Sequence, residues 1–299
     1  MNHFKELTNV AKISFTIDEM NSNTTKAIIF AIEKLLPQSN SKKIMVHIGL
    51  NNLLKSDHEA RCYSKLIKYF RGIHAPVEMN LALENSFYNR QLLMSSEYVR
   101  NLSLKGNFVG EDPTQIVGIL NRCRSLKKLK VIDIGDGRPK CLMLKLLLLE
   151  ELEVRWCPFD IRGCPNLKKL TFSAFETSYL YSALKYIQQL SITELIIDEI
   201  GQYFEDEVEA DEKPLELIIP SSVQRLSLLY RDAGSCNDYL PYVLLLPPVS
   251  ESLVIKDLSV MLSNIHEVIW LEKLHLSCQN YSYICPISVV FPPLSKNWK

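Results

Sequence analysis

A chain of 299 residues with 34 basic and 34 acidic side chains carries no net charge, so it lacks the basic surplus typical of proteins that bind nucleic acid or anionic membranes. Hydrophobic residues make up 47% and charged residues 23% of the sequence, values typical of a globular protein. Only 10 glycines occur, and neither GxGxxG nor GxxxxGK[ST] is present, which argues against a nucleotide-binding loop.

The 8 cysteines are scattered, and none belongs to a CxxC pair. In a chain of this length, such irregular spacing does not resemble a disulfide framework and predicts reduced thiols, as in the cytoplasm or the nucleus. The amino-terminal stretch lacks the apolar core of a signal peptide, and the longest apolar run, residues 141–149, is too short to span a bilayer. We therefore expect no membrane association.

The first part of the chain predicts alternating strands and helices. The periodicity of an apolar helix face ends at Pro37, and Asp57 is a candidate N-cap for the next helix. Strands that alternate with helices in units of about 30 residues predict parallel packing. The expected strands are residues 10–17, 44–48 and 77–85, and the expected helices are residues 26–36, 57–73 and 113–124.

From residue 99 onward, the apolar pattern L-x-x-L-x-Φ recurs. A single unit cannot bury its apolar face alone, so neighbouring units must stack with their strands side by side. We therefore predict one domain, residues 1–299, of about ten irregular repeats. The clearest copies are Leu126-Leu129-Val131, Leu149-Leu152-Val154 and Leu167-Leu170-Phe172; further copies start at Val99, Ile192, Val223 and Leu271, and a weaker one covers residues 252–255.

Charged residues next to these leucines support the same alignment. In adjacent parallel strands, residues at equal offsets lie side by side, about 4.8 Å apart. Lysines of one copy then face glutamates of the next, which either fixes the register or offers a surface to a charged partner; exposed pairs contribute only about 0–1 kcal/mol each. The aligned residues are Lys127-Lys128, Glu150-Glu151, Lys168-Lys169 and Thr193-Glu194, and then Lys130, Glu153 and Thr171.

Two segments depart from the repeat. From Glu194 to Lys213 there are nine acidic residues against one lysine, concentrated in residues 204–213. We predict an exposed acidic loop there; the alternative is a site for a basic partner or a cation, although the spacing of a calcium loop is absent. Residues 240–248 are apolar and bracketed by prolines, which predicts a packed segment on the outer side of a unit with few strands.

The cysteine positions resemble the cysteine-containing subclass of leucine-rich repeats. Cys123 and Cys164 each stand three residues before the first leucine of a copy, and Cys157 closes the copy that begins at Leu149. The subclass is best known from F-box proteins that select substrates for ubiquitin ligases. The resemblance implies an α/β solenoid, a horseshoe with parallel strands on its concave face and helices on its convex face. It also implies no cofactor and a protein target on the concave face; no F-box segment is evident.

Zinc binding is the alternative role for the cysteines. The absence of CxxC pairs and of paired histidines argues against a zinc site. In this type of repeat, cysteines act as small buried residues with a weak S–H donor.

Six residues are candidates for contacting a partner. Trp156 and Arg155 end one strand, and aromatic and arginine side chains anchor many interfaces. Packing of Trp156 against the next unit is the alternative. Tyr230 and Arg231 occupy the similar place after another strand. The full set is Arg155, Trp156, Lys130, Glu153, Tyr230 and Arg231.

These features predict a protein-binding module without enzymatic activity, located in the cytoplasm or the nucleus. The resemblance favours target recognition in an F-box-type ubiquitin ligase, associated with Skp1 and a cullin. The alternative is a stand-alone scaffold or inhibitor similar to ribonuclease-inhibitor proteins. A third class, a GTPase-activating module, would need a positioned arginine or asparagine that the sequence does not single out. We expect neither nucleic acid nor a membrane as a partner.

Overall fold

The chain divides into two compact units. Unit 1 comprises Met1–Lys140 and Leu146–Leu149, and unit 2 comprises Cys141–Lys145 and Glu150–Lys299. The computed structural model describes residues 12–35, 45–50, 56–73, 77–84, 95–105, 113–132, 142–155, 159–174, 177–200, 216–229, 242–256, 260–262, 268, 270–277 and 288–289.

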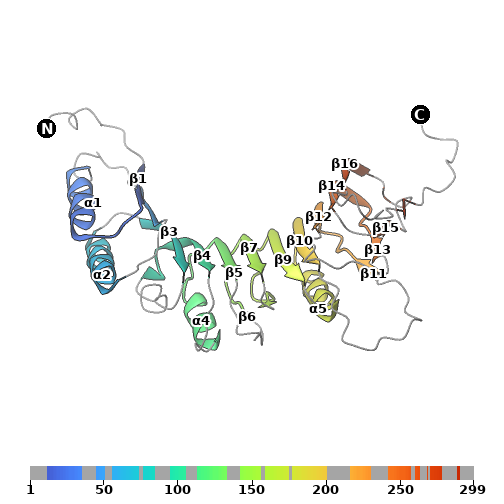
Figure 1. Ribbon diagram of the computed structural model, residues 1–299, viewed down its shortest axis with the longest axis horizontal. Coiled ribbons are helices and arrows are strands. Elements are labelled where there is room, and N and C mark those ends of the chain that lie inside the picture. Colours follow the sequence, from blue (N-terminus) through green and yellow to red (C-terminus); the bar gives the residue numbers. More distant parts are fainter. Residues whose placement is uncertain are drawn as a thin grey trace. The chain divides into compact units, whose positions relative to one another are not determined.

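Unit 1 contains five parallel strands, and described helices follow β1, β2 and β4 (Figure 1). The strands pair in chain order, each with the next, and every pairing is parallel. The strands are β1 (Lys12–Ile17), β2 (Met45–Leu50), β3 (Val77–Glu84), β4 (Val99–Lys105) and β5 (Lys128–Ile132), and the helices are α1 (Ser22–Leu35), α2 (Asp57–Gly72) and α4 (Pro113–Leu120).

Side chains at the helix starts hold the first turns of α1 and α2. The Asn21 carboxamide oxygen accepts hydrogen bonds from the backbone N–H groups of Asn23 and Thr24, at 3.0 and 2.9 Å. Ser56 caps α2: its hydroxyl accepts from the Glu59 N–H at 3.3 Å, and the Glu59 carboxylate accepts from the Ser56 N–H at 2.9 Å. The predicted N-cap, Asp57, is instead the first helical residue, because Ser56 and Glu59 complete a reciprocal capping box.

The core of unit 1 forms from one face of the sheet and the inner faces of α1 and α2. Val46, Ile48 and Met79 on the strands are fully buried. The two helices contact each other. The buried residues of each helix are spaced three or four apart, as on the apolar face of an amphipathic helix. These residues are Thr25, Ile28 and Ile32 on α1 and Cys62, Tyr63, Leu66, Ile67 and Phe70 on α2.

Unit 2 is built mainly from strands. The strands of its main sheet pair in the order β7-β9-β10-β12-β14-β16, again all parallel. The strands are β6 (Leu142–Met143), β7 (Glu151–Arg155), β8 (Phe159–Asp160), β9 (Lys169–Ala174), β10 (Glu194–Ile200), β11 (Glu216–Ile218), β12 (Arg225–Leu229), β13 (Tyr242–Leu245), β14 (Val249–Lys256), β15 (Val260–Leu262), β16 (Trp270–Ser277) and β17 (Ser288–Val289), and the helix is α5 (Thr177–Ile187).

A second parallel sheet, β11-β13-β15-β17, replaces helices in the later part of unit 2 (Figure 1). The chain alternates between the two sheets from β10 to β17, and β6 and β8 form a further two-stranded sheet. Leu217 and Leu244 on the second sheet and Leu228 and Ile255 on the main sheet are fully buried, so both sheets contribute to the core.

The register predicted from the leucines is confirmed in both units. In unit 1, Leu102 lies beside Leu129 and Leu104 beside Val131. In unit 2, the second leucines of six copies form one row, and the first five are at most 4% exposed. The weakly marked copy at residues 252–255 is part of β14, with Leu253 and Ile255 in the rows. The row is Leu152, Leu170, Leu195, Leu226, Leu253 and Leu274.

The α/β class with a large parallel sheet agrees with the sequence-based expectation, but one feature differs. Helices were expected on the outer side of the units, whereas strands β11, β13, β15 and β17 follow β10, β12, β14 and β16. Residues 240–248 contain one of them, β13, and Leu244 and Leu246 are buried as a packed segment requires. The predicted acidic loop, residues 204–213, lies outside the described residues.

Candidate functional site

One face of the main sheet in unit 2 lies opposite the buried leucines, and most of its described side chains are at least partly exposed. We call it the outward face and define it by three rows of aligned residues. The first row is Glu151, Lys169, Glu194, Arg225, Ser252 and Lys273. The second row is Glu153, Thr171, Ile196, Ser227, Val254 and His275. The third row is Ser173, Asp198, Leu229, Lys256 and Ser277, with Arg155 one residue beyond Val154 on β7.

The first row contains the predicted ladder of opposite charges. Glu151 lies beside Lys169, and Lys169 lies beside Glu194. The Lys169 ammonium pairs with the Glu194 carboxylate, which also pairs with Arg225 Nη2 at 3.2 Å. Lys169 and Glu194 are thus largely satisfied across the strands, and their main effect is to favour this register, whereas more than half of the Arg225 side chain stays exposed.

Arg155 joins two carboxylates of the outward face. Its Nε donates to Glu153 Oε1 at 2.9 Å, and its Nη2 pairs with Asp198 Oδ2 at 3.0 Å. Asp198 is 2% exposed, and a buried carboxylate of this kind needs an opposite charge beside it. Because only 24% of the Arg155 side chain is exposed, it ties β7 to β10 and leaves little surface for a partner.

Of the six predicted contact residues, Arg155 and Glu153 are described in unit 2, and they form an ion pair. Lys130 lies on β5 in unit 1, beside Ser103 of β4, and is partly exposed. Trp156, Tyr230 and Arg231 lie outside the described residues. The predicted set as a whole therefore stays a prediction.

A different group of cations lies on β12, β14 and β16. Arg225, Lys256 and Lys273 surround Val254, and we call these three cations the basic triangle. The side chains of Arg225 and Lys273 are 53% and 73% exposed, and Lys256 is partly exposed. The leucine register could have revealed the triangle, because each member stands at a fixed offset from the second leucine of its copy.

The outward face changes its charge from one strand group to the other. On β7, β9 and β10 it carries four carboxylates against two cations. The outward positions on β12, β14 and β16 carry the three cations of the triangle and no carboxylate. The carboxylates nearest in sequence, Glu251 and Glu272, precede these positions at the amino-terminal ends of β14 and β16.

Apolar side chains lie beside the triangle. Ile196, Leu229 and Val254 belong to the second and third rows and are partly exposed. At the start of β16, Trp270 is 59% exposed, but it stands four residues before Leu274, so strand alternation places it on the side of the leucines and not on the outward face. Exposed aromatic residues are frequent anchors of protein interfaces, and Trp270 was not among the predicted contact residues.

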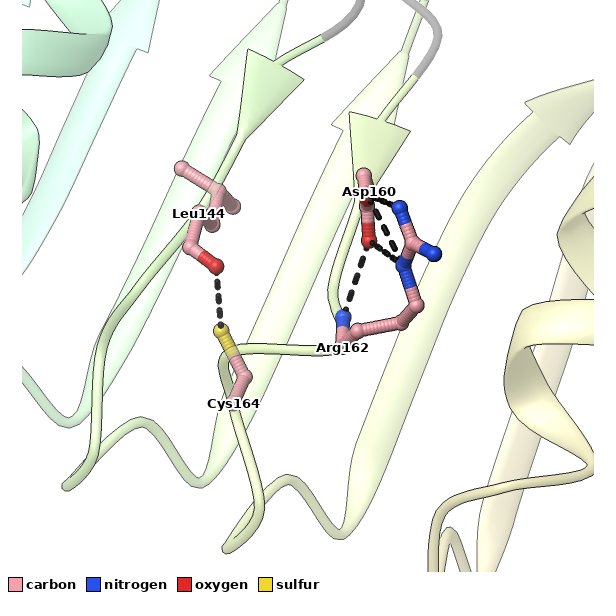
Figure 2. Close-up of polar contacts among 4 residues, drawn as sticks. All are labelled: Leu144, Asp160, Arg162 and Cys164. Carbon is pink, nitrogen blue, oxygen red and sulfur yellow. Dashed lines mark hydrogen bonds and ion pairs between the residues drawn. The ribbon is translucent and has the colours of Figure 1, made fainter.

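Away from the outward face, a compact turn follows β8 (Figure 2). The Asp160 carboxylate accepts hydrogen bonds from the backbone N–H and the guanidinium of Arg162, at 3.1 Å and 3.0 Å to Oδ1. These hydrogen bonds hold the pKa of Asp160 below its usual range. The Arg162 guanidinium also lies 5.0 Å from the ring centre of Tyr186 on α5, so the turn is fastened on two sides.

Gly163 allows this turn to approach the backbone of residues 144–145. A Cβ at that position would lie 2.5 Å from the Leu144 carbonyl oxygen and 2.9 Å from Lys145 Cα, both backbone atoms that cannot easily move aside. The turn therefore depends on glycine for its packing.

The described cysteines are buried structural residues. The Cys164 thiol donates to the Leu144 carbonyl at 3.7 Å (Figure 2), and the Cys123 thiol donates to the Ile119 carbonyl at 3.6 Å. Burial raises the pKa of Cys123 to about 12, so its thiol stays protonated and unreactive at neutral pH. Within the described residues, no group of three or more His, Cys, Asp or Glu side chains is placed to hold a metal ion.

None of the described helices combines the length and apolar character needed to cross a lipid bilayer.

Comparisons with known proteins give no further guide to function. No family model, curated protein or solved structure matches the chain. Its function must therefore be inferred from the arrangement of its own residues, above all those on the outward face.

Proposed function

We propose that the chain is a non-enzymatic protein-binding module and that the outward face of unit 2 is its binding surface. The observation that carries this proposal is the set of partly exposed apolar side chains, Ile196, Leu229 and Val254, in fixed rows of one sheet. Interface cores are richer in apolar and aromatic residues than other surfaces, which favours such a set of side chains as a binding surface.

The sheet reduces the cost of ordering such a surface. Each strand is hydrogen-bonded to its neighbours, and the inner side chains on β10, β12 and β14 are buried. A rigid surface loses less conformational entropy on binding than a mobile loop does, so more of the contact energy contributes to affinity.

The proposal includes a leucine-rich-repeat solenoid as the architecture. The aligned rows of leucines support it, and so does the burial of Cys123 and Cys164 against backbone carbonyls. By the same resemblance, we propose target recognition in an F-box-type ubiquitin ligase as the cellular context. The alternative context is a stand-alone scaffold or inhibitor.

Affinity purification with two matched variants tests the binding surface. Val254→Asn removes an apolar contact from the outward face, whereas Val117→Asn makes the same change at a partly exposed position on α4. We expect Val254→Asn to lose a stoichiometric partner that the unaltered chain and Val117→Asn retain, while both variants keep the same circular dichroism spectrum. Recovery of the same proteins with all three chains would contradict the proposal.

The proteins recovered also separate the two contexts. Skp1 and a cullin beside the target would support the ligase role. A stoichiometric target that is repeatedly recovered without them would favour the scaffold or inhibitor.

A further inference from the structure

We infer that the basic triangle binds an extended acidic segment of a partner protein, in which two carboxylates flank an apolar residue. The inference deepens the proposed function and rests on it, because it states what chemistry a partner brings to the outward face.

Charge complementarity is the first reason. The outward positions of β12, β14 and β16 hold Arg225, Lys256 and Lys273 without a carboxylate among them. Arg225 pairs with Glu194 at 3.2 Å and Lys273 with Glu272 at 3.6 Å, but more than half of each cationic side chain remains exposed. Exposed pairs of this kind are weak, so both cations remain able to bind another carboxylate.

The strand register fixes the shape of the triangle. Arg225 and Lys273 lie on opposite sides of Ser252, so two strand spacings, about 10 Å, separate their Cα atoms. Lys256 lies further along β14, about 13 Å beyond Ser252, and therefore roughly 14 Å from each of the other two cations. Val254 lies between Ser252 and Lys256, near the middle.

This geometry selects an extended occupant. In an extended chain, residues i and i+4 are about 13 Å apart, which matches the distance from Lys256 to Arg225 or Lys273. Two acidic residues at that spacing would each face a cation, and the residue midway between them would lie over Val254. An apolar residue at the middle position would then bury part of Val254.

A protein segment fits better than a nucleic acid. Nucleic-acid affinity comes mainly from many phosphate contacts, typically about 6–10 in a strong complex, whereas the triangle offers three cations around an apolar centre. His275 is the one ring among the aligned outward positions of β12, β14 and β16, whereas proteins that bind single strands stack aromatic rings on successive bases.

Methyl NMR on the full, isotope-labelled chain tests the inference, because it detects binding with a Kd as weak as about 1 mM. The probe is an end-blocked peptide, Ser-Glu-Ser-Val-Ser-Glu-Ser. The controls are its analogues with glutamine or lysine in place of glutamate, and a single-stranded oligothymidylate. We expect the acidic peptide alone to produce a saturable shift of the Val254 methyl resonances.

Charge-reversal variants locate the site. Lys256→Glu should weaken acidic-peptide binding about tenfold, since it replaces an attraction with a repulsion. Lys185→Glu makes the same charge change at an exposed position on α5 and should leave the affinity for the acidic peptide unchanged. Both variants are compared by thermal melting, and Lys273→Glu serves as the second variant should Lys256→Glu unfold.

Three results would overturn the inference: no saturable shift at Val254, equal shifts with the glutamine analogue, or tighter binding of the oligothymidylate. A fourth result would distinguish failure of this inference from failure of the proposed function. A partner whose capture depends on Val254 but not on Lys256 or salt would leave the binding module in place and refute the acidic segment.

Discussion

Asp160 and Arg162 illustrate how single residues stabilise unit 2. Asp160 is 7% exposed, and its carboxylate accepts hydrogen bonds from both the backbone and the side chain of Arg162. These contacts favour the ionised carboxylate, which is why the pKa of Asp160 lies below its usual range. A group whose pKa is lower in the folded state stabilises the fold above its unfolded pKa and ceases to do so as the pH falls through its folded pKa.

Asp160→Asn should therefore lower the free energy of unfolding at pH 7 and have less effect in acid. We expect a loss of about 1–2 kcal/mol at pH 7, since the Arg162 side chain is half exposed and solvent weakens the pair. The difference between the two proteins should shrink as the pH falls from about 4, where an unfolded aspartate begins to protonate. Urea titrations at several pH values measure it, and a difference that stays constant down to about pH 3 would refute this role.

The sequence predicted the position of Arg155 but not how deeply its carboxylate partner is buried. Its place on the outward face followed from its offset from Leu152, and the structure agrees. Its carboxylate partner, Asp198, stands at the same offset from Leu195 on β10. Extending the charge ladder by one row would have indicated this pair, but the depth at which Asp198 is buried depends on what packs around it.

At the scale of single elements, equivalent leucines experience different surroundings. Leu253 on β14 is fully buried between β12 and β16, whereas Leu274 at the same place on β16 is 44% exposed. β14 has neighbours on both sides in the main sheet, and β16 is the last strand in its order. The pattern L-x-x-L-x-L marks both residues as core, yet burial requires a neighbour to cover them.

Leu253→Ala and Leu274→Ala form a matched pair that measures this difference. We expect Leu253→Ala to lower the free energy of unfolding by about 2–5 kcal/mol, because it removes buried methyl groups and leaves a cavity. Leu274→Ala should cost less than about 1.5 kcal/mol, since much of that side chain is already in contact with water. Urea denaturation of both variants provides the comparison, and equal losses would mean that Leu274 is covered in solution.

The sequence did not predict the second sheet of unit 2, because its strands are short. β11 has 3 residues and β13 has 4, too few to display an alternation that differs from a short apolar run. By contrast, α2 has 16 residues, and its amphipathic pattern placed the helix within one residue of its observed end.

At the scale of the whole molecule, the two compact units predict separate local stability. In stacked-repeat proteins each element contacts mainly its neighbours, so a local loss of packing spreads little. Leu66 on α2 in unit 1 and Leu253 on β14 in unit 2 are both fully buried, which makes them suitable probes.

Native-state hydrogen exchange of two alanine variants checks this expectation. Leu66→Ala should accelerate amide exchange chiefly in α1, α2 and the strands of unit 1, and Leu253→Ala chiefly in β12, β14 and β16. Each should lower the local opening free energy by about 2–5 kcal/mol. Equal acceleration throughout both units would show instead that the whole chain unfolds cooperatively.

The sequence by itself determined the parallel strands, their register and the buried cysteines Cys123 and Cys164. These features follow from local spacing, because leucines at fixed intervals can share one core only if the strands align in one way. Tertiary structure alone decided how deeply each charged side chain is buried and how fully its neighbours neutralise it. Arg155 and Lys256 are both cations in the third row of the outward face, yet one lies between two carboxylates and the other lies beside Leu229. Neighbours far apart in sequence determine that difference, because the strength of a charge at a surface depends on what surrounds it.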